Sequence, residues 1–174
     1  MDIDQATLIE NLPAFCLARV LILGVGNVLF GDDGFGPAVV EALQKDYAIP
    51  EDIYVMDVGT GVRKLLFTLI LGDSYPKEVV IVDAVDWGDQ IGNVKIISAE
   101  QLPATKIDDF SLHQIPTSNM LRELQDQCQV EVNVVVCDVG ELPQLIEPGL
   151  TYLTSQAVQT ASRKIATMFS LEPL

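Results

Sequence analysis

Short apolar segments without polar alternation constrain the fold of this chain more than any other feature. RVLILGVG at 19–26 is the clearest of them, and EVVIVDAV at 78–85 has the same character. Continuous runs of Val, Ile and Leu are typical of strands that are covered on both faces, as in the middle of a parallel sheet. GPAVVEALQKDY at 36–47 instead has apolar residues at helical spacing, with Pro37 near the start of the helix. Strands that alternate with helices in this way predict an α/β domain.

The remaining segments complete a three-layer arrangement around a five-stranded sheet. The strand predicted at 92–99 follows its predecessor after about seven residues, which is too short for a helical crossover. We therefore expect it to run antiparallel, as a neighbour or at an edge of an otherwise mostly parallel sheet. The helix at 117–127 has Thr117 or Ser118 as its cap. The prediction is an α/β/α sandwich with strands at 19–26, 53–59, 78–85, 92–99 and 130–140 and helices at 36–47, 61–72, 117–127 and 151–169.

Length and charge limit the organisation and the partners of the chain. Its 174 residues favour one domain over 1–174, with 1–18 as an N-terminal extension that is helical near 5–12. A formal net charge of −15 argues against binding nucleic acid or an anionic membrane surface. The N-terminus is acidic where a signal peptide would be basic, and no apolar run approaches the length needed to cross a bilayer. With three cysteines and no CxxC motif, we expect a reduced, cytoplasmic protein.

Acidic side chains follow the predicted strands at the point where each strand ends. GDDG at 31–34 places Asp32 and Asp33 behind the first strand, and Asp57 and Asp83 end the next two. In open α/β sheets, ligands bind along the carboxyl edge of the strands. We therefore expect Asp33, Asp57 and Asp83 to converge although they are far apart in the sequence.

A strand, a glycine turn and a helix also make a cradle for phosphate, so a nucleotide-binding module is an alternative. The dinucleotide fingerprint needs glycine at position 29, where this chain has Leu29, and the carboxylates of Asp32 and Asp33 would oppose a pyrophosphate. Asp57 stands where a ribose-binding carboxylate would lie and is the best point in favour. This alternative is therefore the weaker one.

The single histidine, His113, is a candidate metal ligand. A lone imidazole is more often a surface or packing residue, but this one lies in FSLHQIP, just before a helix cap. Two carboxylates and one imidazole make an open site for a divalent transition metal, which can polarise a carbonyl or activate water. We interpret Asp86 and Asp89 as turn carboxylates and Cys137 as an inert buried thiol. The residues alone leave a metal-assisted hydrolase and a metal-binding module open.

Four segments together resemble a known family. LGVGNVLFGDDGFGPAVVEAL at 23–43, DVGTG at 57–61, VIVDAVDWG at 80–88 and HQ at 113–114 are similar, in this order, to the maturation endopeptidases of nickel–iron hydrogenases. The similarity covers most of the chain, from about residue 19 to residue 169. LLFTLILGDSYPKEVVIVDAVDWG most closely resembles the branch that serves the deazaflavin-reducing hydrogenases of methanogenic archaea, which use a coenzyme of the F type.

The resemblance implies an endopeptidase that removes a C-terminal extension from the hydrogenase large-subunit precursor once nickel is in place. The family's metal ligands fall on Asp33, Asp83 and His113. The nickel that they engage is carried by the precursor, and zinc or cadmium would be surrogates. Asp32 is left as a support for the loop or its helix.

The family's recognition loop falls on DVGT at 57–60, where Val58 replaces a frequent glycine. Substrate contacts are implied at Gly59, Thr60 and Gly61, and a catalytic role at Asp57. The metal would act as a Lewis acid on the carbonyl and on a bound water, or it would position the bond while Asp57 or a water assists proton transfer. A nickel-binding chaperone without peptidase activity would use the same residues and is a further alternative.

Overall fold

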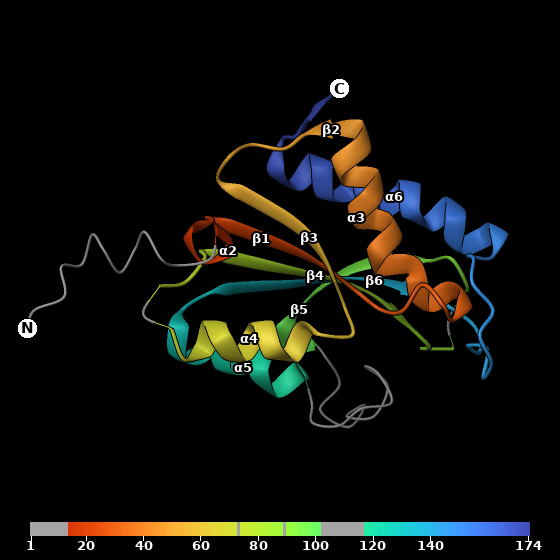
Figure 1. Cartoon of the computed structure of the whole chain (residues 1–174), viewed down its shortest axis with the longest axis horizontal. Coiled ribbons are helices and arrows are strands. Elements are labelled where there is room, and N and C mark those ends of the chain that lie inside the picture. Colours follow the sequence, from red (N-terminus) through yellow and green to blue (C-terminus); the bar gives the residue numbers. More distant parts are fainter. Residues whose placement is uncertain (1–13, 73, 89, 102–116) are drawn as a thin grey trace, which may run out of the picture.

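A five-stranded sheet forms the centre of the molecule (Figure 1). The computed structural model describes residues 14–72, 74–88, 90–101 and 117–174. Across the sheet the order is β3 (Ile53–Gly59), β1 (Val20–Val25), β4 (Glu78–Val85), β6 (Glu131–Asp138) and β5 (Val94–Ser98). The first four strands are parallel and β5 is antiparallel to β6, so the predicted fold class is confirmed. The strand expected to return antiparallel is an edge strand, and its partner is β6 rather than the preceding strand β4.

Helices cover both faces of the sheet (Figure 1). One face carries α3 (Phe35–Asp46) and α6 (Tyr152–Phe169), and the other carries α4 (Val62–Ile70) and α5 (Thr117–Cys128). The short elements are α2 (Ala14–Leu17), the 3₁₀ turns η1 (Gly31–Gly34) and η2 (Ala99–Gln101), and a small antiparallel pair of β2 (Tyr47–Ala48) with β7 (Glu172–Pro173). The pair β2–β7 was not predicted. The helical stretch predicted near 5–12 lies outside the described residues.

Strand β4 shows how one strand serves two cores. Val80 and Val82 pack against the α3/α6 face, whereas Val79 and Ile81 pack against the α4/α5 face. This alternation follows from the two-residue period of a strand. Each fully buried side chain of this size contributes about 1.5–3 kcal/mol relative to exposure. Successive residues of a strand therefore place their side chains on opposite faces of the sheet. The same alternation applies to acidic residues at the ends of strands.

Glycines bring the start of α3 directly onto the sheet. A Cβ on Gly36 would overlap the carbonyl oxygens of Val25 and Val82, and a Cβ on Gly24 would overlap the carbonyl of Gly36. Only residues without a side chain allow this approach, so the GDDG turn of η1 lies against the carboxyl ends of β1 and β4. In the part of the chain that the structure describes, no helix is both long and apolar enough to cross a membrane.

Candidate active site

Asp33 lies in the η1 turn at the carboxyl edge of the sheet and is half-buried. The backbone N–H of Asn27 donates a hydrogen bond of 2.7 Å to Oδ2 of Asp33, which fixes the carboxylate against the end of β1. Burial raises the pKa of Asp33, and the hydrogen bond from Asn27 opposes that shift. The carboxylate is thus held in place but is poorly solvated.

Asp83 is buried at the end of β4, with only 4% of its surface exposed. Asp83 lies two residues from Ile81 and from Val85, which both pack on the α4/α5 face, so its side chain lies on that face as well. The backbone N–H of Ala84 donates to Oδ1 of Asp83 over 2.8 Å. Burial raises the pKa of Asp83 well above its usual range, and the charge of Asp33 raises it further. The close approach of Gly36 to Val82 places the η1 turn at the carboxyl end of β4, so the two expected ligands lie near each other, as the effect of the Asp33 charge on Asp83 also indicates.

Neither Asp33 nor Asp83 has an ion-pair partner among the described residues. Two neighbouring carboxylates that are both shielded from water repel each other, and a cation between them would relieve this cost. Oxygen donors of this kind accept divalent metals. The chemistry of the pair therefore fits a metal-binding role.

Asp57 does not join this pair. Gly24 of β1 is aligned with Asp57 on one side and with Val82 on the other, so Asp57 shares the face of Val82, and Asp83 points to the opposite face. Strand β1 separates β3 from β4. The backbones of Asp57 and Asp83 are therefore about 10 Å apart across the sheet. Of the three carboxylates expected to converge, the structure brings two together.

The loop after β3 is shaped by its glycine. Oδ1 of Asp57 accepts a hydrogen bond of 2.8 Å from the N–H of Gly59, and the carbonyl of Gly59 accepts one of 3.1 Å from the N–H of Gly26. Gly59 has a φ of +51°, a left-handed conformation that favours glycine. Val58 does not have a positive φ, and its side chain packs against the α4/α5 core. A residue with a side chain can therefore replace glycine at this position. Thr60 and Gly61, two of the expected substrate contacts, are exposed.

The third expected ligand, His113, lies outside the described residues, as does Gln114. Within the described ranges no group of three His, Cys, Asp or Glu side chains is placed to hold a metal ion. The ligand set of Asp33, Asp83 and His113 therefore remains a prediction.

Asp32, the other acid of GDDG, faces inward. Only 7% of its surface is exposed, and its carboxylate accepts hydrogen bonds of 2.7 Å from the N–H of Thr151 and 2.8 Å from the Thr151 hydroxyl. Thr151 is the N-cap residue of α6. Asp32 does support a helix, but that helix is α6 rather than the one that follows GDDG.

The sequence interpretation missed Asp138, which ends β6 beside Val85 of β4. Oδ1 of Asp138 accepts a hydrogen bond of 3.0 Å from the N–H of Trp87 and so fixes the turn that follows Asp83. Its position at the end of an apolar strand, like that of Asp83, was a signal that could have found it. In the same turn Asp86 accepts from the N–H of Gly88 over 3.2 Å, as expected of a turn carboxylate, and Asp89 lies outside the described residues.

Cys137 does not contribute to the site. It is fully buried in β6, and burial together with the charges of Asp32 and Asp138 raises the pKa of its thiol to about 12. A thiol of this kind is neutral at physiological pH and is a poor nucleophile. The interpretation of Cys137 as an inert thiol is confirmed.

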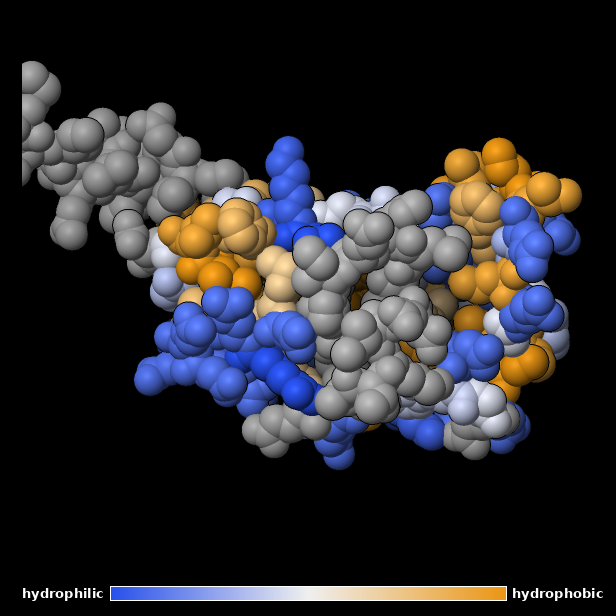
Figure 2. All heavy atoms as spheres, turned by 90° about the horizontal axis from the view of Figure 1, so that it is seen from below, coloured by the Kyte–Doolittle hydropathy of each residue, from blue (hydrophilic) through white to orange (hydrophobic). Residues whose placement is uncertain are grey.

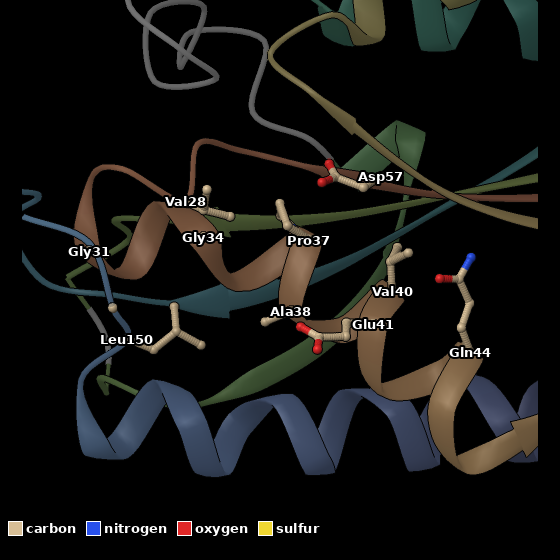
Figure 3. Close-up of a pocket in the computed structure, with 11 residues that line it drawn as sticks. Val28, Gly31, Gly34, Pro37, Ala38, Val40, Glu41, Gln44, Asp57 and Leu150 are labelled. Atoms are coloured by element: carbon tan, nitrogen blue, oxygen red, sulfur yellow. The ribbon is translucent and has the colours of Figure 1, made fainter. Parts of the chain in front are cut away.

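A groove of about 420 Å³ runs along the outer side of α3 (Figure 3). Val28 and Leu150 lie at one end, beside the η1 turn, and Gln44 and Asp57 lie toward the other. Glu41 projects between them from the helix. The groove therefore connects the turn that carries Asp33 with the carboxylate of Asp57.

A comparison of the sequence with protein-family profiles identifies the family of this protein over most of the chain. The profile described as hydrogenase maturation protease matches residues 37–168. The chain belongs to this family. The resemblance noted in its sequence motifs is therefore confirmed.

Members of the hydrogenase maturation protease family also match individually. A candidate hydrogenase maturation protease of Methanocaldococcus jannaschii is 38% identical over 144 residues, which covers 82% of this chain and 90% of the relative. Coenzyme F420 hydrogenase subunit delta of Methanothermobacter thermautotrophicus is 32% identical over 152 residues, with 85% and 92% covered. The solved structure of the hydrogenase maturating endopeptidase HybD from Escherichia coli superimposes with a TM-score of 0.70 at 26% identity, over 90% of this chain and 96% of that one.

Family membership decides between the alternatives that the sequence left open. The protein is a hydrolase of the peptidase class, as are the hydrogenase maturation endopeptidases that it resembles. A nucleotide-binding module and a binding protein without peptidase activity are not supported.

Proposed function

We propose that this protein cuts a C-terminal extension from the large-subunit precursor of a nickel–iron hydrogenase after nickel insertion. The observation that carries the proposal is the pair of Asp33 and Asp83 at the carboxyl edge of the sheet, two neighbouring carboxylates that have no counter-ion among the residues the structure describes. The similarity to coenzyme F420 hydrogenase subunit delta supports a deazaflavin-reducing hydrogenase as the partner. The whole chain, 1–174, would act as one peptidase unit in the cytoplasm, without nucleic acid or membrane partners.

In this proposal the nickel is part of the substrate. The oxygens of Asp33 and Asp83 and the imidazole of His113 would bind the nickel that the precursor already holds, and so dock the precursor in register. Mixed carboxylate and imidazole donors suit a divalent transition metal, and zinc or cadmium could replace nickel in the isolated protein. Asp138 supports the site indirectly, because it fixes the backbone at Trp87, which follows Asp83 closely.

Asp57 would act from the other side of β1. One of its oxygens is occupied by the N–H of Gly59, and the carboxylate is exposed. Because β1 separates Asp57 from Asp83 and the two side chains point to opposite faces, the substrate chain would have to cross the carboxyl end of β1 to meet both carboxylates. Asp57 would accept a proton from an attacking water, while Gly59, Thr60 and Gly61 contact the substrate chain next to it.

The deciding experiment is an intact-mass measurement on nickel-loaded and nickel-free precursor, each incubated with the protein. Loss of one C-terminal peptide from the nickel-loaded form alone is the expected result. Cleavage of both forms would retain the peptidase and discard nickel as the trigger. Cleavage of neither form, with tight binding of the loaded one, would overturn the proposed proteolysis.

A further inference from the structure

We propose that the groove along α3 binds an extended stretch of four or five residues of the protein substrate, with a basic side chain near Glu41 and an apolar one near Leu150. This inference rests on the proposed function and extends it from the metal to the peptide. One stripe lines the groove: Gly34 at the end of η1, followed by Pro37, Ala38, Glu41 and Gln44 of α3. From Gly34 to Gln44 this stripe spans about 15 Å, the length of four or five extended residues.

The polar part of the groove offers hydrogen-bond acceptors without a balancing cation. Glu41 has no hydrogen bond or ion pair among the described residues. The amide nitrogen of Gln44 donates to the carbonyl of Val55 over 2.9 Å, and the amide oxygen of Gln44 is available as an acceptor. Asp57 keeps one oxygen that the N–H of Gly59 does not use. No Lys or Arg is among the described residues that line the groove, so a Lys or Arg side chain of a ligand is its complement.

The other end of the groove is apolar. Val28, Pro37, Ala38 and Leu150 line it, and Val28 is 53% exposed. Figure 2 shows that apolar side chains gather at the end of the molecule that carries η1 and the start of α6 in Figure 1. An exposed apolar surface next to a groove is typical of a binding site for another chain. An apolar side chain of the ligand would be removed from water here.

The position of the groove indicates the partner. Gly31 and Gly34, which line its first part, flank Asp33 in the η1 turn. A chain whose metal is bound at Asp33 would therefore enter the groove directly and pass toward Asp57. The net charge of −15 adds a long-range attraction for a basic segment. These observations favour a segment of the protein substrate close to the cut bond over an unrelated ligand.

Charge reversal at Glu41 tests the proposal in the full reaction. Glu41→Lys should raise the KM for nickel-loaded precursor at least about tenfold, because it places a cation where the ligand's cation binds. Glu41→Gln should have a smaller effect. Glu51→Lys is the matched control, because Glu51 is exposed, lies outside the groove and undergoes the same change of charge. Equal KM values for Glu41→Lys and Glu51→Lys would overturn the proposal.

A second measurement separates this inference from the proposed function. We would titrate ¹⁵N-labelled protein with acetyl-Leu-Ala-Ala-Lys-Ala-amide and with the same peptide carrying Glu in place of Lys. The Lys peptide should shift the amide resonances of residues 34–44 and 149–150, and the Glu peptide and the Glu41→Lys variant should show no such shift. Binding of the Lys peptide without any cleavage of precursor would retain the groove and reject the function. Cleavage of precursor without a shift in the groove, or equal shifts from n-butylammonium alone, would reject the groove.

Discussion

Thr151 donates both its backbone N–H and its hydroxyl to the carboxylate of Asp32, a residue 119 positions earlier in the chain. The Thr151 hydroxyl also accepts from the N–H of Thr154 as the cap of α6, over 3.4 Å. One buried carboxylate thus joins the GDDG turn to the first turn of the last helix. Asp32 and Asp33 have separate tasks, and the following predictions depend on that division.

Removing the carboxylate of Asp32 should destabilise the fold. A hydrogen bond to a charged group contributes about 1.5–3 kcal/mol, so Asp32→Ala should lower the free energy of unfolding by about 2–3 kcal/mol in urea denaturation. Asp32→Asn should lose less, because the amide oxygen can still accept from Thr151. Its loss of precursor processing should also be milder than that of Asp33→Asn. The reverse order would mean that Asp32, and not Asp33, is the metal ligand.

Substitutions at the predicted ligands should separate activity from stability. Asp33→Asn, Asp83→Asn and His113→Ala should each lower the processing rate by about 100-fold or more, because the docking of nickel depends on all three donors. Asp83→Asn should not lower the thermal midpoint, because it removes a charge that burial disfavours. Intact mass and circular dichroism measure the two properties. Processing at the wild-type rate by His113→Ala would contradict the ligand set.

The contact of α3 with the sheet should not tolerate a methyl group. Gly36→Ala forces a Cβ into the carbonyl oxygens of Val25 and Val82, and overpacking of this kind costs about 1–3 kcal/mol. Gly140→Ala is the control, because its Cβ would meet only the end of the Ile91 side chain, at 3.3 Å. Urea unfolding of both variants is the measurement. Similar losses from the two substitutions would show that the close approach at Gly36 is not the cause.

Glu78 predicts a pH dependence of stability away from the site. Burial raises the pKa of Glu78, the hydrogen bond from Asn133 lowers it, the charge of Glu131 raises it and that of Arg19 lowers it, with a net increase. The folded state therefore binds this proton more tightly than the unfolded state, so the contribution of Glu78 is fully present below its ordinary pKa of 4.5 and is lost as the pH rises through the folded value.

Glu78→Gln should remove the pH-dependent contribution of this side chain to the free energy of unfolding. The free energy of unfolding of the variant, relative to the wild type, should increase as the pH rises from about 4 to about 7, because the neutral amide avoids a partly buried charge. The Gln oxygen can still accept from Asn133 Nδ2, which lies 3.0 Å from Glu78 Oε1. A difference between the two proteins that stays constant over this range would show that Glu78 titrates normally.

The sequence predicted the layers of the fold and the meeting of Asp33 with Asp83, because both depend on apolar runs and on the parallel direction of β1 and β4. It did not predict that Asp57 faces the other side. That fact depends on register: Gly24 is level with both Asp57 and Val82, which places Asp83 one residue further along. Register is a property of the assembled sheet, and residue patterns within one strand do not contain it.

The contact between Asp32 and Thr151 was also inaccessible to sequence reasoning. Two adjacent acids in a glycine turn look equivalent in the sequence, and only the packing of a helix from the far end of the chain distinguishes them. The partner of β5 is a similar case. The spacing predicted its antiparallel direction, but β6, which comes later in the chain, lies between β5 and β4.

The η1 turn ends at Gly34 and α3 begins at Phe35, so no linker separates the residue expected to hold the metal from the wall of the groove. A helix is a rigid spacer of about 1.5 Å per residue. With nickel bound at Asp33 and the substrate chain in the groove, the length of α3 would act as a ruler measured from the metal. The position of the cut would then be set by distance from the nickel, whereas the side chains held in the groove would determine how tightly the substrate binds.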